Sequence, residues 1–430
     1  MSRMAKAGKR TRMWLVGVAV LGVLVVSGGV AAARADHSDG DSARSVAKIG
    51  PAATPKTEKS RQPGQKPRPG PTPSPTTSSV GTPTPTATTT TSPSPGTGSD
   101  VKIPVAGFVP YFWSGDIVVD EARGRIYITG GKGTRDIVVT DLDGGVIRTI
   151  RDVAPGAAGM TLSPDGNKLY VAASDRDWLT IVDLDTYATT GQFAGKTDGT
   201  MTCPRDVAFA AGQLWVAWGC DNAPAGIGLV DLQTGGFYPN VTEGDGDIRS
   251  LLSSPALLAT LPNEPNIVIA GATDSNPAGL YRFEATSTRL VLRATGTTDG
   301  GSVRQMAVTP DGSQIVIPSG APYYHQVFRT SDLTLAGKYQ TTTYPNAVAI
   351  RDDGLVVAGT DSSYDKDVWV FQPGGTTPIA TFEFGHLPDQ YTWAHTLVDG
   401  GLAVHGNRIY ALTAQLSEPE MVTLRIRTVP

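Results

Sequence analysis

Six polar residues stand at or just before the start of short apolar segments, where side chains of this kind can bind a ligand. They are two arginines, two aspartates, a glutamine and an asparagine: Asp116, Arg205, Asp206, Arg304, Gln305 and Asn346. Guanidinium groups match the oxygens of carboxylates and phosphates, while carboxylates and amides bind hydroxyl or amino groups. If the fold gathers these residues, the chemistry that they offer is the binding of a small polar or anionic ligand. They lie far apart in the chain, so they can bind one ligand only if the strands that carry them bring them close together in space.

The signatures of common catalytic sites are missing from the sequence. There is no G-x-S-x-G nucleophile motif, no H-E-x-x-H, no C-x-x-C and no glycine-rich phosphate loop before a helix. Four histidines follow residue 100, and none of them pair at the spacing of a metal motif: His325, His386, His395 and His405. His386 and His395 share one segment, which is either a metal-binding arm or, more commonly, a pair of exposed or structural histidines. We therefore predict no metal site and no cofactor.

One acidic segment superficially resembles the start of a calcium loop. Glu243, Asp245 and Asp247 place carboxylates at alternate positions. An EF-hand loop also needs a glycine at its sixth position and an acidic residue at its twelfth. Those positions hold Ile248 and Ser254 here. We interpret the segment as an acidic surface loop, with weak calcium binding as the alternative.

The chain has two cysteines, Cys203 and Cys220. Cys203 precedes the apolar segment 206–210, and Cys220 follows the segment 214–218, which is the expected hairpin partner. The far ends of an antiparallel hairpin meet, so we expect the two sulfur atoms to lie within bridging distance. In an exported protein a disulfide is the expected outcome, and a reactive thiol or a metal-binding pair is the alternative.

The elements that position these residues follow a repeating unit, shown best by residues 163–193. It begins with the turn SPDG at 163–166, in which proline presets one backbone angle and glycine accepts the other. Two segments of alternating residues follow, at 168–173 and 179–184, as expected for half-buried strands. A third short strand ends the unit.

Related units recur along the chain after residue 100. Seven turn positions, separated by 42 to 54 residues, mark them: Gly124, Gly166, Gly212, Asn266, Gly312, Gly354 and Gly406. A period of this length with about four short strands in each unit is typical of a β-propeller blade. We therefore predict an all-β fold, a seven-bladed β-propeller. A β-sandwich array, the alternative, would need shorter and less regular turn spacing.

The last unit ends after its third strand, and the segment 101–111 has no other role. We predict that this segment supplies the missing fourth strand and closes the ring. The first strand of each blade lines the axis of a propeller, so the six polar residues should converge on one axial mouth. There they either form hydrogen bonds across blades around a water-filled channel or bind a ligand. Four aromatic residues in neighbouring loops would add a sugar- or peptide-binding rim: Tyr323, Tyr324, Tyr344 and Trp393.

The first hundred residues have a different character. Basic residues precede an uncharged run at 13–33, so residues 1–35 form either a signal peptide cleaved after Ala35 or a retained transmembrane anchor. Residues 36–100 are rich in Pro, Thr and Ser and predict a disordered tether. The propeller is expected to span 101–430. Either interpretation of the N-terminus places it outside the cytoplasm, secreted or anchored to the outer face of the cell membrane.

Charge limits the range of partners. From Val101 onward there are 23 Lys plus Arg against 35 Asp plus Glu, a formal charge of −12. An acidic body argues against nucleic-acid binding through phosphate neutralisation. We expect a monomer that contacts a membrane only through the N-terminal segment, if that segment is retained.

The repeat resembles one family in particular. PDG turns, LYVA-type second strands and VDL-type third strands, as in SPDGNKLYVAAS and LTIVDLD, are similar to YVTN or YncE-like propellers. Stretches such as VVDEARGRIYITGG and TYPNAVAI resemble secreted actinobacterial propellers of this kind, within the wider lactonase-type and WD-like superfamily. Unlike longer relatives, this protein is expected to carry no immunoglobulin-like repeats after the propeller. The resemblance implies the propeller fold and an extracytoplasmic location, and it says little about biochemical activity. We predict a binding module for an envelope component, a protein or a small polar ligand. The alternative is a propeller enzyme of lactonase or lyase type with its site at the axial mouth.

Overall fold

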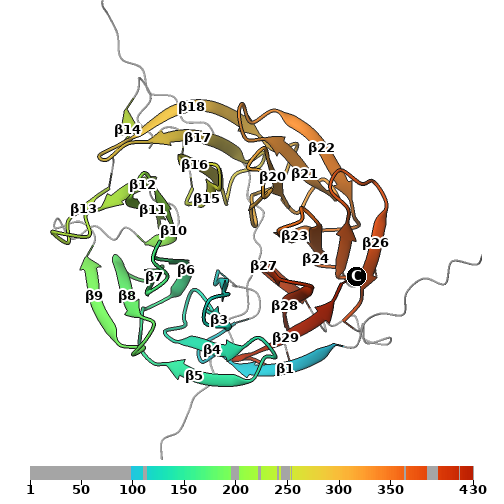
Figure 1. Ribbon diagram of the computed structural model, residues 1–430, viewed down its shortest axis with the longest axis horizontal. Helices are drawn as coiled ribbons and strands as arrows, with labels where there is room; N and C mark the ends of the chain where they lie inside the picture. Colours follow the sequence, from blue (N-terminus) through green and yellow to red (C-terminus); the bar gives the residue numbers. More distant parts are fainter. Residues whose placement is uncertain are drawn as a thin grey trace, which may run out of the picture. The chain divides into compact units, whose positions relative to one another are not determined.

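The computed structural model describes residues 98–109, 114–194, 203–220, 224–239, 242–243, 252, 254–362, 365–384, 396–415 and 417–429. These residues form seven separate sheets around a central axis (Figure 1), and no helix occurs among them. None of the described residues therefore belongs to a helix that could cross a membrane. The predicted signal peptide or anchor, nearly all of the tether, and the predicted positions Asp245, Asp247, His386, Trp393 and His395 lie outside the described residues.

Each sheet is one blade, and its strands follow the chain from the axis outward. Blade 1 holds β2 (Ile117–Asp120), β3 (Arg125–Ile128), β4 (Ile137–Asp141) and β5 (Val146–Ile150). Blade 2 holds β6 (Ala157–Leu162), β7 (Lys168–Ala173), β8 (Trp178–Asp183) and β9 (Thr189–Ala194). Blade 3 holds β10 (Pro204–Ala210), β11 (Gln213–Gly219), β12 (Ala225–Val230) and β13 (Phe237–Tyr238). Blade 4 holds β15 (Ala256–Leu261), β16 (Glu264–Ala272), β17 (Gly279–Ala285) and β18 (Leu290–Thr297).

The remaining blades complete the ring. Blade 5 holds β19 (Ala307–Val308), β20 (Gln314–Ile317), β21 (Tyr324–Arg329) and β22 (Leu335–Gln340). Blade 6 holds β23 (Pro345–Ile350), β24 (Val356–Thr360), β25 (Val368–Phe371) and β26 (Pro378–Phe382). Blade 7 holds β27 (Thr396–His405), β28 (Arg408–Ala414), β29 (Met421–Thr428) and β1 (Ser99–Pro104). The predicted seven-bladed propeller is thereby confirmed.

Blade 4 departs from the predicted pattern of four strands. A short strand, β14 (Thr242–Glu243), pairs in parallel with β18 at its outer edge and makes the sheet five-stranded. It comes from the connection between blades 3 and 4, so the additional strand is recruited from a segment outside the repeat.

The ring closes through β1, as the sequence predicted, although the strand begins at Ser99, upstream of the expected segment. It pairs antiparallel with β29, from Ser99 opposite Ile426 to Pro104 opposite Met421 (Figure 1). Asp100 adds ion pairs to Arg425 (2.5 Å) and Arg427 (2.8 Å) on the same partner strand. The first and last strands of the propeller thus share one sheet, blade 7, and this pairing closes the ring.

The strands of the repeating unit are more deeply buried than their alternation suggests. The prediction of a half-buried strand at 168–173 was wrong, because every residue of β7 after Lys168 is buried. Leu169 and Val171 pack with Tyr127 and Val139 of blade 1. Tyr170 belongs to a second cluster that reaches blade 3. A blade is covered by a neighbour on each face, so both sets of alternating side chains enter a core.

Candidate functional site at the axial mouth

A cavity of about 610 Å³ runs along the inner strands, from residues at their starts, such as Asp116 and Arg205, to residues at their ends, such as Leu162 and Phe209. Residues from blades 1 to 5 and from blade 7 line it. Five of the six predicted polar residues are among them: Asp116, Arg205, Asp206, Arg304 and Gln305. The structure therefore brings these five together from three different blades, and it leaves Asn346 outside the lining.

Two aspartates use both carboxylate oxygens to bind backbone amides. Asp116 accepts from its own neighbour Ile117 (2.8 Å) and from Met160 in blade 2 (2.8 Å). Asp206 accepts in the same way from Val207 (2.8 Å), and its second oxygen accepts from the next blade. Each carboxylate thus joins the inner strand of one blade to that of the next, which is the cross-blade role considered from the sequence.

Gln305 plays the corresponding part in blade 5. Its side-chain oxygen accepts from the amide of Val348 in blade 6 (2.7 Å). Its side-chain nitrogen donates to the carbonyl of Leu402 in blade 7 (3.1 Å). This one amide therefore fixes three inner strands, and both of its polar groups are satisfied by backbone.

Asn346 is buried in β23, with 3% of its surface exposed. Its side-chain nitrogen donates to the carbonyl of Leu397 in blade 7 (2.6 Å), while its side-chain oxygen is buried and has no hydrogen-bond partner among the described residues. The burial and the bond to Leu397 indicate that Asn346 holds blades 6 and 7 together behind the cavity wall.

Arg304 forms an ion pair across the mouth. Its guanidinium lies 2.9 Å from Asp399 of blade 7, and both side chains are partly exposed to the cavity. The sequence carries no signal for Asp399, because the recognisable unit of blade 7 begins at Ala403. The register of β27 and β28 shifts between Leu397 and Leu402, so the bulge places Asp399 at the mouth.

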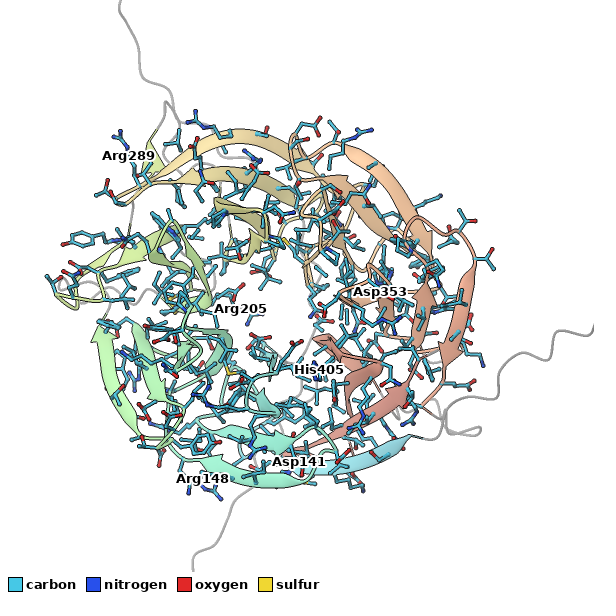
Figure 2. The ribbon with its side chains drawn as sticks, viewed as in Figure 1. Asp141, Arg148, Arg205, Arg289, Asp353 and His405 are labelled. Carbon is cyan, nitrogen blue, oxygen red and sulfur yellow. A yellow bond between two sulfur atoms is a disulfide. The ribbon has the colours of Figure 1, made fainter. Side chains whose placement is uncertain are left out.

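Arg205 projects from the inner edge of blade 3 toward the central opening (Figure 2). Among the described residues its guanidinium has one hydrogen-bond partner, the carbonyl oxygen of Ser114 (3.1 Å). A guanidinium carries five N–H donors, so most of the donors of Arg205 have no hydrogen-bond partner among the described residues. Gly159 of blade 2 allows the backbone of β10 to approach closely. A Cβ at this position would lie 2.8 Å from the carbonyl oxygen of Arg205.

Burial shapes the electrostatics of the mouth. It lowers the pKa of Arg205, and the carboxylates of Asp206, Asp274 and Asp399 oppose that effect. Burial also raises the pKa of Asp206 to about 7, and the nearby carboxylate of Asp116 acts in the same direction. The pKa of Asp399 is raised by burial despite its pairing with Arg304. Around neutral pH, protonation of Asp206 therefore makes the surroundings of the guanidinium less negative.

The predicted disulfide between Cys203 and Cys220 is confirmed, with Cα atoms 5.1 Å apart. Cys203 lies directly before β10, and Cys220 directly follows β11, its hairpin partner. The bond therefore ties the end of this hairpin next to Arg205, at the mouth itself.

The two described histidines have structural contacts. His325 is fully buried, with its ring nitrogens near the hydroxyl of Thr341 (3.2 Å) and the carbonyl of Ala347 (2.9 Å). Burial lowers its pKa to about 4. His405 lies 3.0 Å from the carboxylate of Glu121. Within the described part of the chain, no three His, Cys, Asp or Glu side chains are grouped as a metal site would require.

The seven sheets around this polar axial cavity define a seven-bladed β-propeller. Its architecture is similar to that in the crystal structure of the Myceliophteria thermophila Cps50 (Swd1) β-propeller domain, with a TM-score of 0.55 and 13% identity. The alignment covers 77% of this chain and 100% of that domain. At this identity the similarity shows the fold alone. No protein-family model and no curated protein matches the chain.

Proposed function

We propose that this protein is an extracytoplasmic binding module, related to YVTN or YncE-like propellers, whose axial mouth takes a small ligand bearing a carboxylate. The observation that carries the proposal is the position of Arg205. Its guanidinium lies in the cavity wall and uses one of its donors on Ser114. A ligand carboxylate would accept a pair of hydrogen bonds from this planar group.

The rest of the mouth supports the same chemistry. Arg304 lies on the same wall and adds a second positive charge, which Asp399 holds in place. The carboxylates of Asp274 and Asp399 line the cavity and would accept hydrogen bonds from ligand hydroxyl or amino groups. Asp116, Asp206 and Gln305 are satisfied by backbone and would act as positioning residues.

The extracytoplasmic location rests on the sequence of the N-terminus and is supported by the disulfide. Disulfides persist in oxidising compartments, and the bond between Cys203 and Cys220 is formed here. Residues 1–35, whether cleaved or retained, would deliver the propeller to that side of the membrane, and the Pro/Thr/Ser-rich segment 36–100 would act as its tether.

The test is calorimetric titration of the purified chain with small carboxylates, phosphates and neutral sugars. We expect carboxylates to bind, and Arg205→Ala to weaken binding by about 10- to 100-fold, the value of a charge-assisted hydrogen bond. Arg289→Ala is the matched control, because Arg289 lies on the outer rim (Figure 2). Carboxylate binding that is equally strong in Arg205→Ala would refute the proposed site.

A further inference from the structure

Two exposed tyrosines stand side by side on the face of the propeller that carries the mouth. Tyr323 directly precedes β21 and Tyr344 directly precedes β23. The first and third strands of a blade run in the same direction, so both residues lie where the inner strands start. Their rings are 5.8 Å apart between centroids and inclined at 63°. With 48% and 56% of their surfaces exposed, they form an angular aromatic ledge, the tyrosine ledge.

Hydrogen bonds hold the backbone beneath the tyrosine ledge. The carbonyl of Tyr323 accepts from the side chain of Gln340 (3.0 Å), and that of Tyr344 accepts from the amide of Asp361 (2.9 Å). Tyr344 also has φ of 53°, in the left-handed region that an aromatic residue adopts at a cost of roughly 1 kcal/mol. A ring that is exposed and yet held in a disfavoured backbone conformation contributes little to folding.

The adjacent residue, Tyr324, makes structural contacts through both its hydroxyl and its ring. The hydroxyl of Tyr324 donates to Asp299 (2.7 Å), and the ammonium of Lys338 lies 4.6 Å from its ring centroid. By contrast, the hydroxyls of Tyr323 and Tyr344 have no hydrogen-bond partner among the described residues. The two rings and two hydroxyls of the tyrosine ledge are therefore available to a ligand.

Short links join the tyrosine ledge to the mouth. Asn346, two positions after Tyr344, donates to the carbonyl of Leu397 (2.6 Å). Asp399, two positions after Leu397, lines the cavity and pairs with Arg304. Burial and the carboxylate of Asp399 raise the pKa of Asp361, whose backbone amide donates to the carbonyl of Tyr344. These links place the tyrosine ledge on the side of the mouth that carries Asp399.

We propose that the tyrosine ledge is a sugar-stacking subsite and that the ligand of the mouth is an acidic oligosaccharide. The C–H faces of one sugar ring pack on Tyr323 and Tyr344, while a carboxylate on another ring reaches Arg205. This inference rests on the proposed function, which it extends from carboxylates in general to one class of ligand.

The size and surroundings of the tyrosine ledge favour a sugar over a protein. The other large apolar side chains that are exposed among the described residues lie mostly on outer strands and turns, such as Ile147, Tyr238 and Leu335. A stable protein interface buries about 800 Å² on each partner and uses a larger cluster of apolar anchors. Two aromatic faces match the C–H groups of a sugar ring, which are attracted to the negative face of the π system.

The test is titration of the purified chain with an oligosaccharide of uronic acids, a neutral oligosaccharide of equal length and a uronic acid monosaccharide. We expect the acidic oligosaccharide to bind best. Tyr323→Ala and Tyr344→Ala should each weaken its binding about 10-fold, and the Phe variants should retain it because they keep the ring. Monosaccharide binding should be unaffected by these changes. Tyr238→Ala, which removes an exposed tyrosine from an outer strand, is the matched control.

The outcomes separate this inference from the proposed function. If the alanine variants bind the acidic oligosaccharide as tightly as the native chain, while Arg205→Ala binds neither it nor the monosaccharide, the tyrosine ledge is not a sugar subsite and the mouth still binds carboxylates. If the alanine variants lose sugar binding but Arg205→Ala has no effect, the ledge binds sugars and the proposed function is wrong. Thermal unfolding of each variant checks that it is folded.

Discussion

The carboxylate of Asp206 in blade 3 accepts a hydrogen bond of 2.7 Å from the backbone amide of Leu258 in blade 4. Asp116 bonds blade 2 in the same manner, and Gln305 bonds blade 6. Polar side chains in blades 1, 3 and 5 thus bind amides of blades 2, 4 and 6. The residues that precede those amides are small or apolar: Gly159, Leu257 and Ala347. Around the axis the blades are therefore joined in pairs, and the seventh receives its bonds from Gln305 and Asn346.

Protonation of Asp206 should make folding stability depend on pH. Its pKa rises from 3.8 in the unfolded chain to about 7 in the folded protein, so the folded state binds more protons between these values. The associated stability is fully present below about 3.8 and is lost as pH rises through about 7. Urea unfolding should show that the wild type loses about 2 kcal/mol between pH 5 and pH 8 relative to Asp206→Asn.

The comparison must be made against a variant because other groups titrate too. Burial lowers the pKa of His325 to about 4, so its contribution to stability is lost as pH falls from 6.5 toward 4. Asp352→Asn, at an exposed position, controls for the loss of a surface carboxylate. A wild type and an Asp206→Asn variant with parallel pH profiles would show that Asp206 is ionised normally.

Gly159 should be intolerant of even a methyl group. A Cβ at this position would lie 2.6 Å from the carboxylate of Asp206 and 2.8 Å from the carbonyl of Arg205. Gly159→Ala should therefore displace β10, destabilise the protein by about 1–3 kcal/mol and weaken carboxylate binding. Chemical denaturation and calorimetric titration measure the two effects.

Gly337 in the outer strand β22 provides the matched control, because a Cβ added there would meet no other atom within 4 Å. Gly337→Ala should leave both stability and binding close to native. Equal effects of the two substitutions would contradict a specific role for the space at Gly159.

Closure of the ring should depend on the inward-facing residue of β1. Ile103 is fully buried among residues of blades 1 and 7, so Ile103→Ala should cost about 2–4 kcal/mol in the free energy of unfolding. Its neighbour Lys102 forms an exposed ion pair with Glu418, and Lys102→Ala should cost less than about 0.5 kcal/mol. If both variants unfold at the same urea concentration as wild type, β1 does not stabilise the ring.

The disulfide should stabilise the fold and hold β10, which carries Arg205, in its position at the mouth. The bond spans a sequence separation of 17, for which the chain-entropy model gives about 3 kcal/mol. Cys203→Ser/Cys220→Ser should therefore unfold at lower urea concentration and bind carboxylates less tightly, since β10 carries Arg205. Alkylation followed by mass measurement should find two modified cysteines only after reduction. Modification without reductant would contradict the bond.

The sequence by itself determined the architecture, because its signals are local. Turns such as 163–166 recur at a nearly constant spacing, and each is followed by strands that pair with their neighbours in the chain. The hairpin that joins Cys203 to Cys220 and the unpaired third strand at the C-terminus were equally local, so the disulfide and the ring closure followed from them. The gathering of five polar residues at one mouth followed from the geometry of a ring.

Tertiary structure decided what those polar residues do. Whether a side chain binds a neighbouring amide, as Asp206 does, or extends toward the cavity, as Arg205 does, depends on residues about fifty positions or more away. The bulge that brings Asp399 to Arg304 and the added strand β14 arise in segments outside the repeat. Burial of both faces of β7 likewise comes from adjacent blades. Contacts between blades carry no periodic signal in the chain, and packing around the axis alone fixes them.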